Sequence, residues 1–185
     1  MPLTLIKETG SGLPDANSYA SVADADSFHD GHLYATTWTS ATTANKEKAL
    51  VLATRLIDAS YQFNGSKTKV TQALQWPREG AIDPDRKTLQ FSALSNVFGP
   101  FFESDQVPKA LLDATCEMAR EVLFADRTDS PDGEGILQLS LVGALTVIFD
   151  KKDRRPVISH LAQSILSKLG TLIRPTQRAA TLVRV

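Results

Sequence analysis

The fold class of this protein follows from the stretch ALVLATRLIDASY, residues 49–61. Its apolar residues recur at intervals of three and four, which is the period of an α-helix with one buried face. The helix is predicted to start after Thr43, whose hydroxyl can cap the first turn, and to end near Tyr61. A turn is expected at Asn64-Gly65. A long amphipathic helix is therefore the centre of the predicted fold.

Capping and loop residues define the segment before this helix. Ser21 is a good N-cap with Asp24 three residues later, a variant capping box that predicts a helix over about 22–34. Threonine and serine dominate residues 36–43, so this stretch is predicted to be a loop. Trp38 is the one large apolar residue in it and is its expected anchor.

Two more helices are predicted towards the C-terminus. Pro108 suits the first turn of a helix over about 108–125. Pro156 opens a last helix that is expected to end near Gly170, because glycine commonly follows the final turn. The apolar residues expected to be mostly buried on the helix faces are Leu50, Leu56, Ile57, Leu111, Leu112, Met118 and Leu123.

Between these two helices, one region follows the period of a β-strand. Five of its apolar residues fall at odd positions: Leu139, Leu141, Leu145, Val147 and Phe149. Alternation of this kind, with Gly143 inside it, predicts a β-hairpin or a long bent strand over 136–150. The expected fold class is mainly α, a small helical bundle with a β-hairpin or bent strand and an extended C-terminal tail.

Composition divides the chain into three parts. Residues 1–125 are predicted to form a helical domain, residues 126–150 a mobile loop with the β element, and residues 151–185 a basic C-terminal helix and tail. The net charge of −1 hides a split, because residues 1–150 hold 12 Lys and Arg against 20 Asp and Glu, whereas residues 151–185 hold 8 against 1. Such asymmetry is typical of a basic tail that meets an acidic partner.

The overall amino-acid composition indicates a soluble globular protein. At 42% hydrophobic and 22% charged residues, the chain is neither disordered nor collagen-like. Its single cysteine, Cys116, cannot form an internal disulfide and favours a reducing compartment. Lys7 and Glu8 interrupt the N-terminus where a signal peptide needs an apolar core. The protein is therefore expected in a cytosol, or in an assembly built there.

The sequence offers weak signals for chemistry. His29 and His32 stand three residues apart, which gives at most an open metal site on one helix. Cys116 lies on the apolar side of its helix, where a buried structural thiol is expected. The chain has no Gly-x-Ser-x-Gly elbow, phosphate-binding Gly-rich loop or dinucleotide fingerprint. We therefore predict no enzymatic activity, no cofactor and no metal.

A single-stranded nucleic-acid groove is a more serious possibility, because such grooves combine stacking aromatic residues with basic ones. The residues that could be arranged this way are Tyr61, Phe63, Lys67, Lys69, Trp76 and Arg78. In the alternative, Tyr61 and Trp76 pack under the loop that follows the long helix. The acidic excess of residues 1–150 favours that packing alternative.

Three stretches carry a family resemblance: ANSYASVADAD at residues 16–26, KEKAL at 46–50 followed by ATRLID at 53–58, and QALQWPR at 72–78. Together they resemble tailed-phage head-tail connector or adaptor proteins, which are often labelled with a DnaT-like single-stranded-DNA-binding domain name. The resemblance covers about residues 14–125. Its most specific parts are Asn17-Ser18-Tyr19 and Trp76-Pro77-Arg78.

This resemblance implies a structural adaptor of the phage neck that forms a twelve-fold ring under the portal and extends the DNA channel. The implied partners are the portal protein, neighbouring copies, a neck or tail completion protein and, with direct contact left open, the genomic DNA. The implied location is the virion, after assembly in the host cytoplasm. One alternative is a DnaT-like single-stranded-DNA-binding replication protein, and another is an interaction domain with no phage role.

Two groups of residues are the expected sites. The structural anchor consists of Tyr61, Trp76, Pro77 and Arg78. Arg78 is expected to be fixed by local packing or by an ion pair with Glu79 or Asp58.

The extended C-terminal run is the expected partner-binding segment. It is predicted to order only on binding, because its apolar surface is too small to fold alone. The expected contacts, with the portal or an adjacent subunit, are made by Arg174, Arg178, Arg184, Leu182 and Val183.

Overall fold

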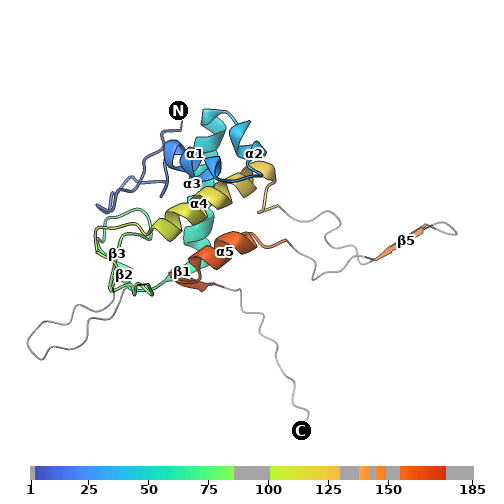
Figure 1. Cartoon of the computed structure of the whole chain (residues 1–185). Coiled ribbons are helices and arrows are strands. Elements are labelled where there is room, and N and C mark those ends of the chain that lie inside the picture. The colour runs from blue at the N-terminus through green and yellow to red at the C-terminus, as the bar shows by residue number, and fades with distance from the viewer. Residues whose placement is uncertain (1–2, 86–100, 130–137, 142–144, 149–154, 174–185) are drawn as a thin grey trace, which may run out of the picture.

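The computed structural model describes residues 3–85, 101–129, 138–141, 145–148 and 155–173. Figure 1 shows helices that pack together, and the short strands of the described part form antiparallel pairs. The predicted class, mainly α with small β parts, is confirmed. Residues 174–185, which hold the predicted extended tail, lie outside the described part.

The first helix, α1 (Val22–Asp30), is shorter than predicted. Its capping box forms as expected, since Ser21 and Asp24 each accept from the backbone N–H of the other. The helix ends at Gly31, whose N–H donates to the carbonyl of His29. The predicted helix over 22–34 therefore overran its end by about one turn.

A four-residue helix, α2 (Thr36–Thr39), occupies part of the stretch predicted to be a loop. Trp38 is fully buried in it, as an anchor should be, and its indole Nε1 donates to Asp26 at 2.8 Å. Burial of this ring fixes the position of the chain between α1 and the next helix. The segment therefore forms a helical turn, although its composition favours a loop.

The central helix is α3 (Thr43–Ser60). It is capped by Thr42, whose Oγ1 accepts from the backbone N–H of Asn45 at 3.4 Å, so the cap lies one residue before the predicted Thr43. Its end agrees with the prediction, because Tyr61 already has extended backbone. The helix buries one side, as the spacing of its apolar residues requires.

The second long helix, α4 (Lys109–Phe124), packs along α3, with Pro108 at its N-cap position rather than inside its first turn. Four of the predicted core residues are fully buried: Leu50, Ile57, Leu111 and Met118. The other three are partly buried against the same core: Leu56, Leu112 and Leu123. The two helices therefore pack through the apolar faces that the spacing of their residues predicted.

The last helix, α5 (His160–Leu166), starts after a Ser159 cap and is shorter at both ends than predicted. Gly170 does not cap it but begins β6 (Gly170–Leu172), which pairs antiparallel with β1 (Tyr61–Phe63). A side chain at Gly170 would stand 2.5 Å from the carbonyl oxygen of Gln62. This glycine is thus needed for the close approach of two backbones.

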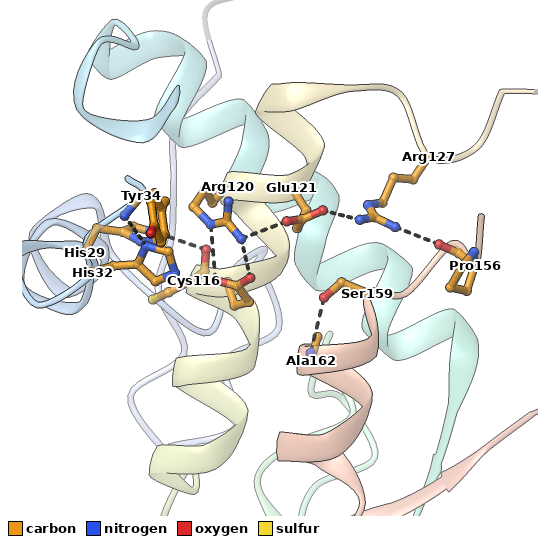
Figure 2. A network of polar contacts seen from close by, with 11 residues as sticks. His29, His32, Tyr34, Cys116, Arg120, Glu121, Arg127, Pro156, Ser159 and Ala162 are labelled. Atoms are coloured by element: carbon orange, nitrogen blue, oxygen red, sulfur yellow. Dashed lines mark hydrogen bonds and ion pairs between the residues drawn. The ribbon is translucent and has the colours of Figure 1, made fainter. Parts of the chain in front are cut away.

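A row of ion pairs links α4 to the segment before α5, as Figure 2 shows. Arg120 contacts Glu117 at 2.6 Å and Glu121 at 2.7 Å, and Glu121 also pairs with Arg127. Arg127 then donates to the carbonyl of Pro156 at 2.8 Å. The predicted basic C-terminal helix is therefore held on the same body as α3 and α4.

Two further strand pairs complete the fold. β2 (Ser66–Lys67) pairs antiparallel with β3 (Arg78–Glu79), in a segment whose sequence indicated only turns and prolines. β4 (Gln138–Leu141) pairs antiparallel with β5 (Leu145–Ile148). Of the two alternatives predicted for residues 136–150, the antiparallel pairing of 138–141 with 145–148 matches the β-hairpin and not one long bent strand.

Candidate nucleic-acid interface

The residues that carry the family resemblance meet at one buried place, the Tyr19 cluster (Tyr19, Asp58, Gln75 and Trp76). The Tyr19 hydroxyl donates to Asp58 at 2.6 Å and accepts from the backbone N–H groups of Gln75 at 3.1 Å and Trp76 at 3.2 Å. The second Asp58 oxygen accepts from Gln75 N–H at 3.1 Å. Three stretches that are far apart in the sequence are thereby tied to α3.

Burial sets the protonation of this cluster. Loss of water raises the pKa of Asp58 to about 6, although the Tyr19 hydrogen bond and the charges of Lys67 and Arg78 act to lower it. Burial, with the neighbouring Asp58 carboxylate, also raises the pKa of Tyr19 well above its ordinary value. At neutral pH the pair is therefore a carboxylate held by a neutral phenol.

Trp76 is completely buried below the loop that follows α3. Its ring lies edge-on to Phe63 and Phe102, with ring centres 6.1 and 5.6 Å away, and the peptide bond to Pro77 is cis. Tyr61 stacks on Phe63 at 5.9 Å. The aromatic residues of the proposed stacking groove are thus core residues, and the groove that needed them exposed is wrong.

Arg78 is also buried and is bound to neutral oxygens. Its guanidinium donates to the backbone carbonyls of Asn64 at 2.7 Å, Gln75 at 3.1 Å and Gly65 at 2.5 Å. Within the described part of the chain it forms no ion pair with Glu79 or Asp58. Burial and hydrogen bonds to nearby backbone carbonyls hold it, in place of the predicted ion pair.

Residues 66–71, called the basic loop below, project from this framework and are all exposed. The Lys67 ammonium donates to the carbonyl of Gln72 at 3.5 Å, and that of Lys69 donates to the carbonyl of Ser11 at 2.6 Å. Among the described residues, neither lysine has a carboxylate partner. Neither ammonium group therefore forms an ion pair within this part of the chain, and both stand at the surface.

Buried hydrogen bonds brace the basic loop from below. The Gln72 side chain accepts from Lys69 N–H at 2.9 Å and donates to the carbonyls of Leu74 and Pro77, at 3.0 Å each. At the side, the Thr68 hydroxyl donates to Ser104 at 3.0 Å. The loop conformation is thus fixed in advance of any binding, which lowers the entropy lost when a ligand is held.

A carboxylate shapes the turn on which Lys69 rests. Glu8 is buried, and it accepts from the backbone N–H groups of Gly10, Gly12 and Leu13 at 2.9, 3.0 and 2.8 Å. Both glycines have positive φ, a conformation that other residues rarely adopt. This turn presents the Ser11 carbonyl to Lys69. Nothing in the sequence pattern marked Glu8 as part of a site.

His29 and Cys116, considered for metal binding and nucleophilic chemistry, are core residues, whereas His32 is half-buried. His29 is buried, with its Nε2 3.1 Å from the carbonyl oxygen of Cys116, and it lies beside His32 in Figure 2. The described residues include no group of three or more His, Cys, Asp or Glu side chains that could hold a metal ion. Burial raises the pKa of the Cys116 thiol to about 12, which leaves it protonated and inert.

The predicted partner-binding residues of the tail all fall outside the described residues: Arg174, Arg178, Arg184, Leu182 and Val183. No helix in the described ranges is both long and apolar enough to cross a membrane.

A comparison with models of protein families identifies the family of this chain. Residues 3–185 match a family model described as "Putative DnaT-like ssDNA binding protein". The chain belongs to this family. No curated protein and no solved structure matches it.

Membership of the DnaT-like family corrects the function implied by the resemblance. The match covers nearly the whole chain and points to single-stranded DNA binding, so the assignment as a structural head-tail adaptor of the virion is wrong. The motif residues shared with the adaptors form the buried Tyr19 cluster. These residues specify the fold, and they do not show which ligand or partner binds to the surface of the protein.

Proposed function

We propose that the protein binds single-stranded DNA, and that the basic loop contacts the phosphate backbone. The observation that carries this proposal is the pair of exposed ammonium groups of Lys67 and Lys69, which donate to carbonyl oxygens and form no ion pair with the residues that the structure describes. The family match supports the same ligand.

The chemistry favours phosphate contacts over base stacking at this loop. A lysine ammonium is a point charge that binds phosphate oxygens of any sequence, and each contact releases a condensed counterion. Trp76, Tyr61 and Phe63 are buried in the core, so these three rings offer no exposed face for a base to stack on. Binding is therefore expected to be tolerant of sequence and sensitive to salt. The protein acts as a binding protein and not as an enzyme in this proposal.

The test is a fluorescence-anisotropy titration of labelled oligo(dT) at several salt concentrations. The variant is Lys67→Ala with Lys69→Ala. The matched control is Lys109→Ala with Lys168→Ala, which removes the same charge from two exposed lysines that pair with Asp113 and Asp85.

The basic-loop variant should weaken binding by about tenfold at low salt, and it should reduce the slope of log affinity against log salt by about 1.4. The control should change affinity by less than about twofold, because its lysines are neutralised in the fold. Equal effects of the two double variants, or no salt-sensitive binding by the unaltered protein, would overturn the proposal.

A further inference from the structure

A second cationic surface lies on the outward side of α3. Its exposed residues recur every three or four positions and therefore form one stripe along the helix. The stripe consists of Ala44, Asn45, Lys48, Leu52, Arg55 and Ala59. No described element covers it, so α3 has one side in the core and the other open to solvent.

The charges of this stripe are uncompensated. Among the residues that the structure describes, Lys48 and Arg55 have no carboxylate partner. Lys46, only two residues from Lys48, contrasts with them, because it turns to the other side of the helix and pairs with Asp26 at 2.7 Å. Arg55 follows Lys48 by seven positions, which places the two residues about 10 Å apart along the helix axis. Two free cations thus stand in line on one face.

The stripe adjoins the basic loop through Asp58. Asp58 follows Arg55 by three residues, so the two lie on neighbouring turns and about 60° apart around the helix. Asp58 accepts from the backbone N–H of Gln75 at 3.1 Å, and Arg78, which donates to the Gln75 carbonyl at 3.1 Å, is the strand partner of Lys67. These contacts place the start of the basic loop near this turn of α3. The two cationic surfaces are therefore neighbours, with the Tyr19 cluster below the boundary between them.

Resting on the proposed function, we infer that a bound single strand continues from the basic loop along the outer face of α3, where Lys48 and Arg55 contact further phosphates. Leu52 lies between these two residues and is 37% exposed, which offers an apolar contact to a base or sugar. The charge of the stripe complements a polyanion, and its continuity with the basic loop requires a ligand longer than one or two nucleotides.

The experiment compares oligo(dT) of about 6 and about 20 nucleotides, lengths chosen to fill the basic loop alone or both surfaces. The variant is Lys48→Ala with Arg55→Ala, and the control is again Lys109→Ala with Lys168→Ala. A second variant, Leu52→Glu, places a negative charge inside the stripe at an exposed position. Thermal melting checks that each variant is folded.

The α3 variant should weaken binding of the long oligonucleotide by about fivefold or more, with less than about a twofold effect on the short one. Leu52→Glu should show the same length dependence. An α3 variant that binds both lengths like the unaltered protein would overturn the inference, even if the basic-loop variant still loses affinity. Failure of the proposed function is distinguishable, because it abolishes the salt-sensitive binding of both lengths in the unaltered protein.

Discussion

Lysines in two regions of the molecule have different partners. Beside α1, the ammonium of Lys46 meets the carboxylate of Asp26 at 2.7 Å and lies 5.1 Å from the centre of the Trp38 ring. In the basic loop, Lys67 and Lys69 contact only backbone carbonyl oxygens. The first charge is satisfied by the fold, whereas the other two remain available to an anion.

This difference shows that residue type alone does not mark a binding surface. The acidic excess of residues 1–150 argues against a polyanion ligand when it is averaged over the chain. The structure places Asp24 and Asp26 in α1, where they pair with Lys7 and Lys46, so part of that negative charge is neutralised away from the basic loop. Local pairing therefore decides which lysines remain open to an anion such as the proposed DNA ligand.

The largest test removes the support under the basic loop. Trp76→Ala should lower the free energy of unfolding by about 3 to 5 kcal/mol, because a fully buried indole leaves a large cavity. Urea denaturation measures the loss. Phe124→Ala is the control, since this ring is 65% exposed and its removal should cost little. A cost below about 1 kcal/mol for Trp76→Ala would contradict the buried position of the ring.

The next test cuts the link between α3 and the loop. Tyr19→Phe removes the hydroxyl that serves Asp58, Gln75 and Trp76, and it should cost about 1 to 3 kcal/mol because buried polar groups lose a partner. Tyr34→Phe is the matched control at an exposed tyrosine. Chemical denaturation of both variants should give a clear difference, and equal stability of the two would show that the hydroxyl is dispensable.

A third test uses pH. The pKa of Asp58 is raised in the fold to about 6, so folding favours its protonated form, and its contribution to stability is greatest at low pH and lost as pH rises from about 4 to 6. The stability of the unaltered protein minus that of Asp58→Asn should therefore be higher at pH 4 than at pH 7, by about 2 kcal/mol. A pH-independent difference would show that Asp58 titrates normally.

The test with the smallest expected effect compares the two lysine environments directly, through Lys46 and Lys69. Lys46→Ala should cost about 1 kcal/mol, because it breaks an ion pair and a cation–π contact. Lys69→Ala should change stability by less than about 0.5 kcal/mol while it weakens DNA binding. Melting curves and anisotropy on both variants separate the two roles. The reverse ranking would mean that the basic loop is structural.

The helical part of the fold could be predicted from the sequence, because it depends on local spacing. The period of three and four residues in α3 and α4 places Leu50, Ile57 and Leu111 in the core, where they are found. The pairing of β1 with β6 could not be predicted in this way. It depends on the pairing of Gly170 with Phe63 and on the close approach of Gly170 to the Gln62 carbonyl, and no local pattern connects such distant residues.

The candidate site was predictable only in part. Lys67 and Lys69 were recognisable as basic residues near aromatic ones, but alternation alone cannot say whether Trp76 is exposed or buried. The carbonyl partners of the two lysines are positioned by the Glu8 turn and by Gln72. These contacts form only in the folded protein, so the sequence pattern does not reveal them. The family resemblance identified the shared framework and misjudged the function, because the motif residues lie under the surface.

The pairing of β1 with β6 also governs the order in which this chain can fold during synthesis. β1 begins at Tyr61 and β6 at Gly170, so the ribosome must make all the residues between them before the pair can close. Contacts between such distant residues form slowly, since a long loop must be ordered first. The helices α3 and α4 can dock while translation continues, and the strand that completes the body is added last.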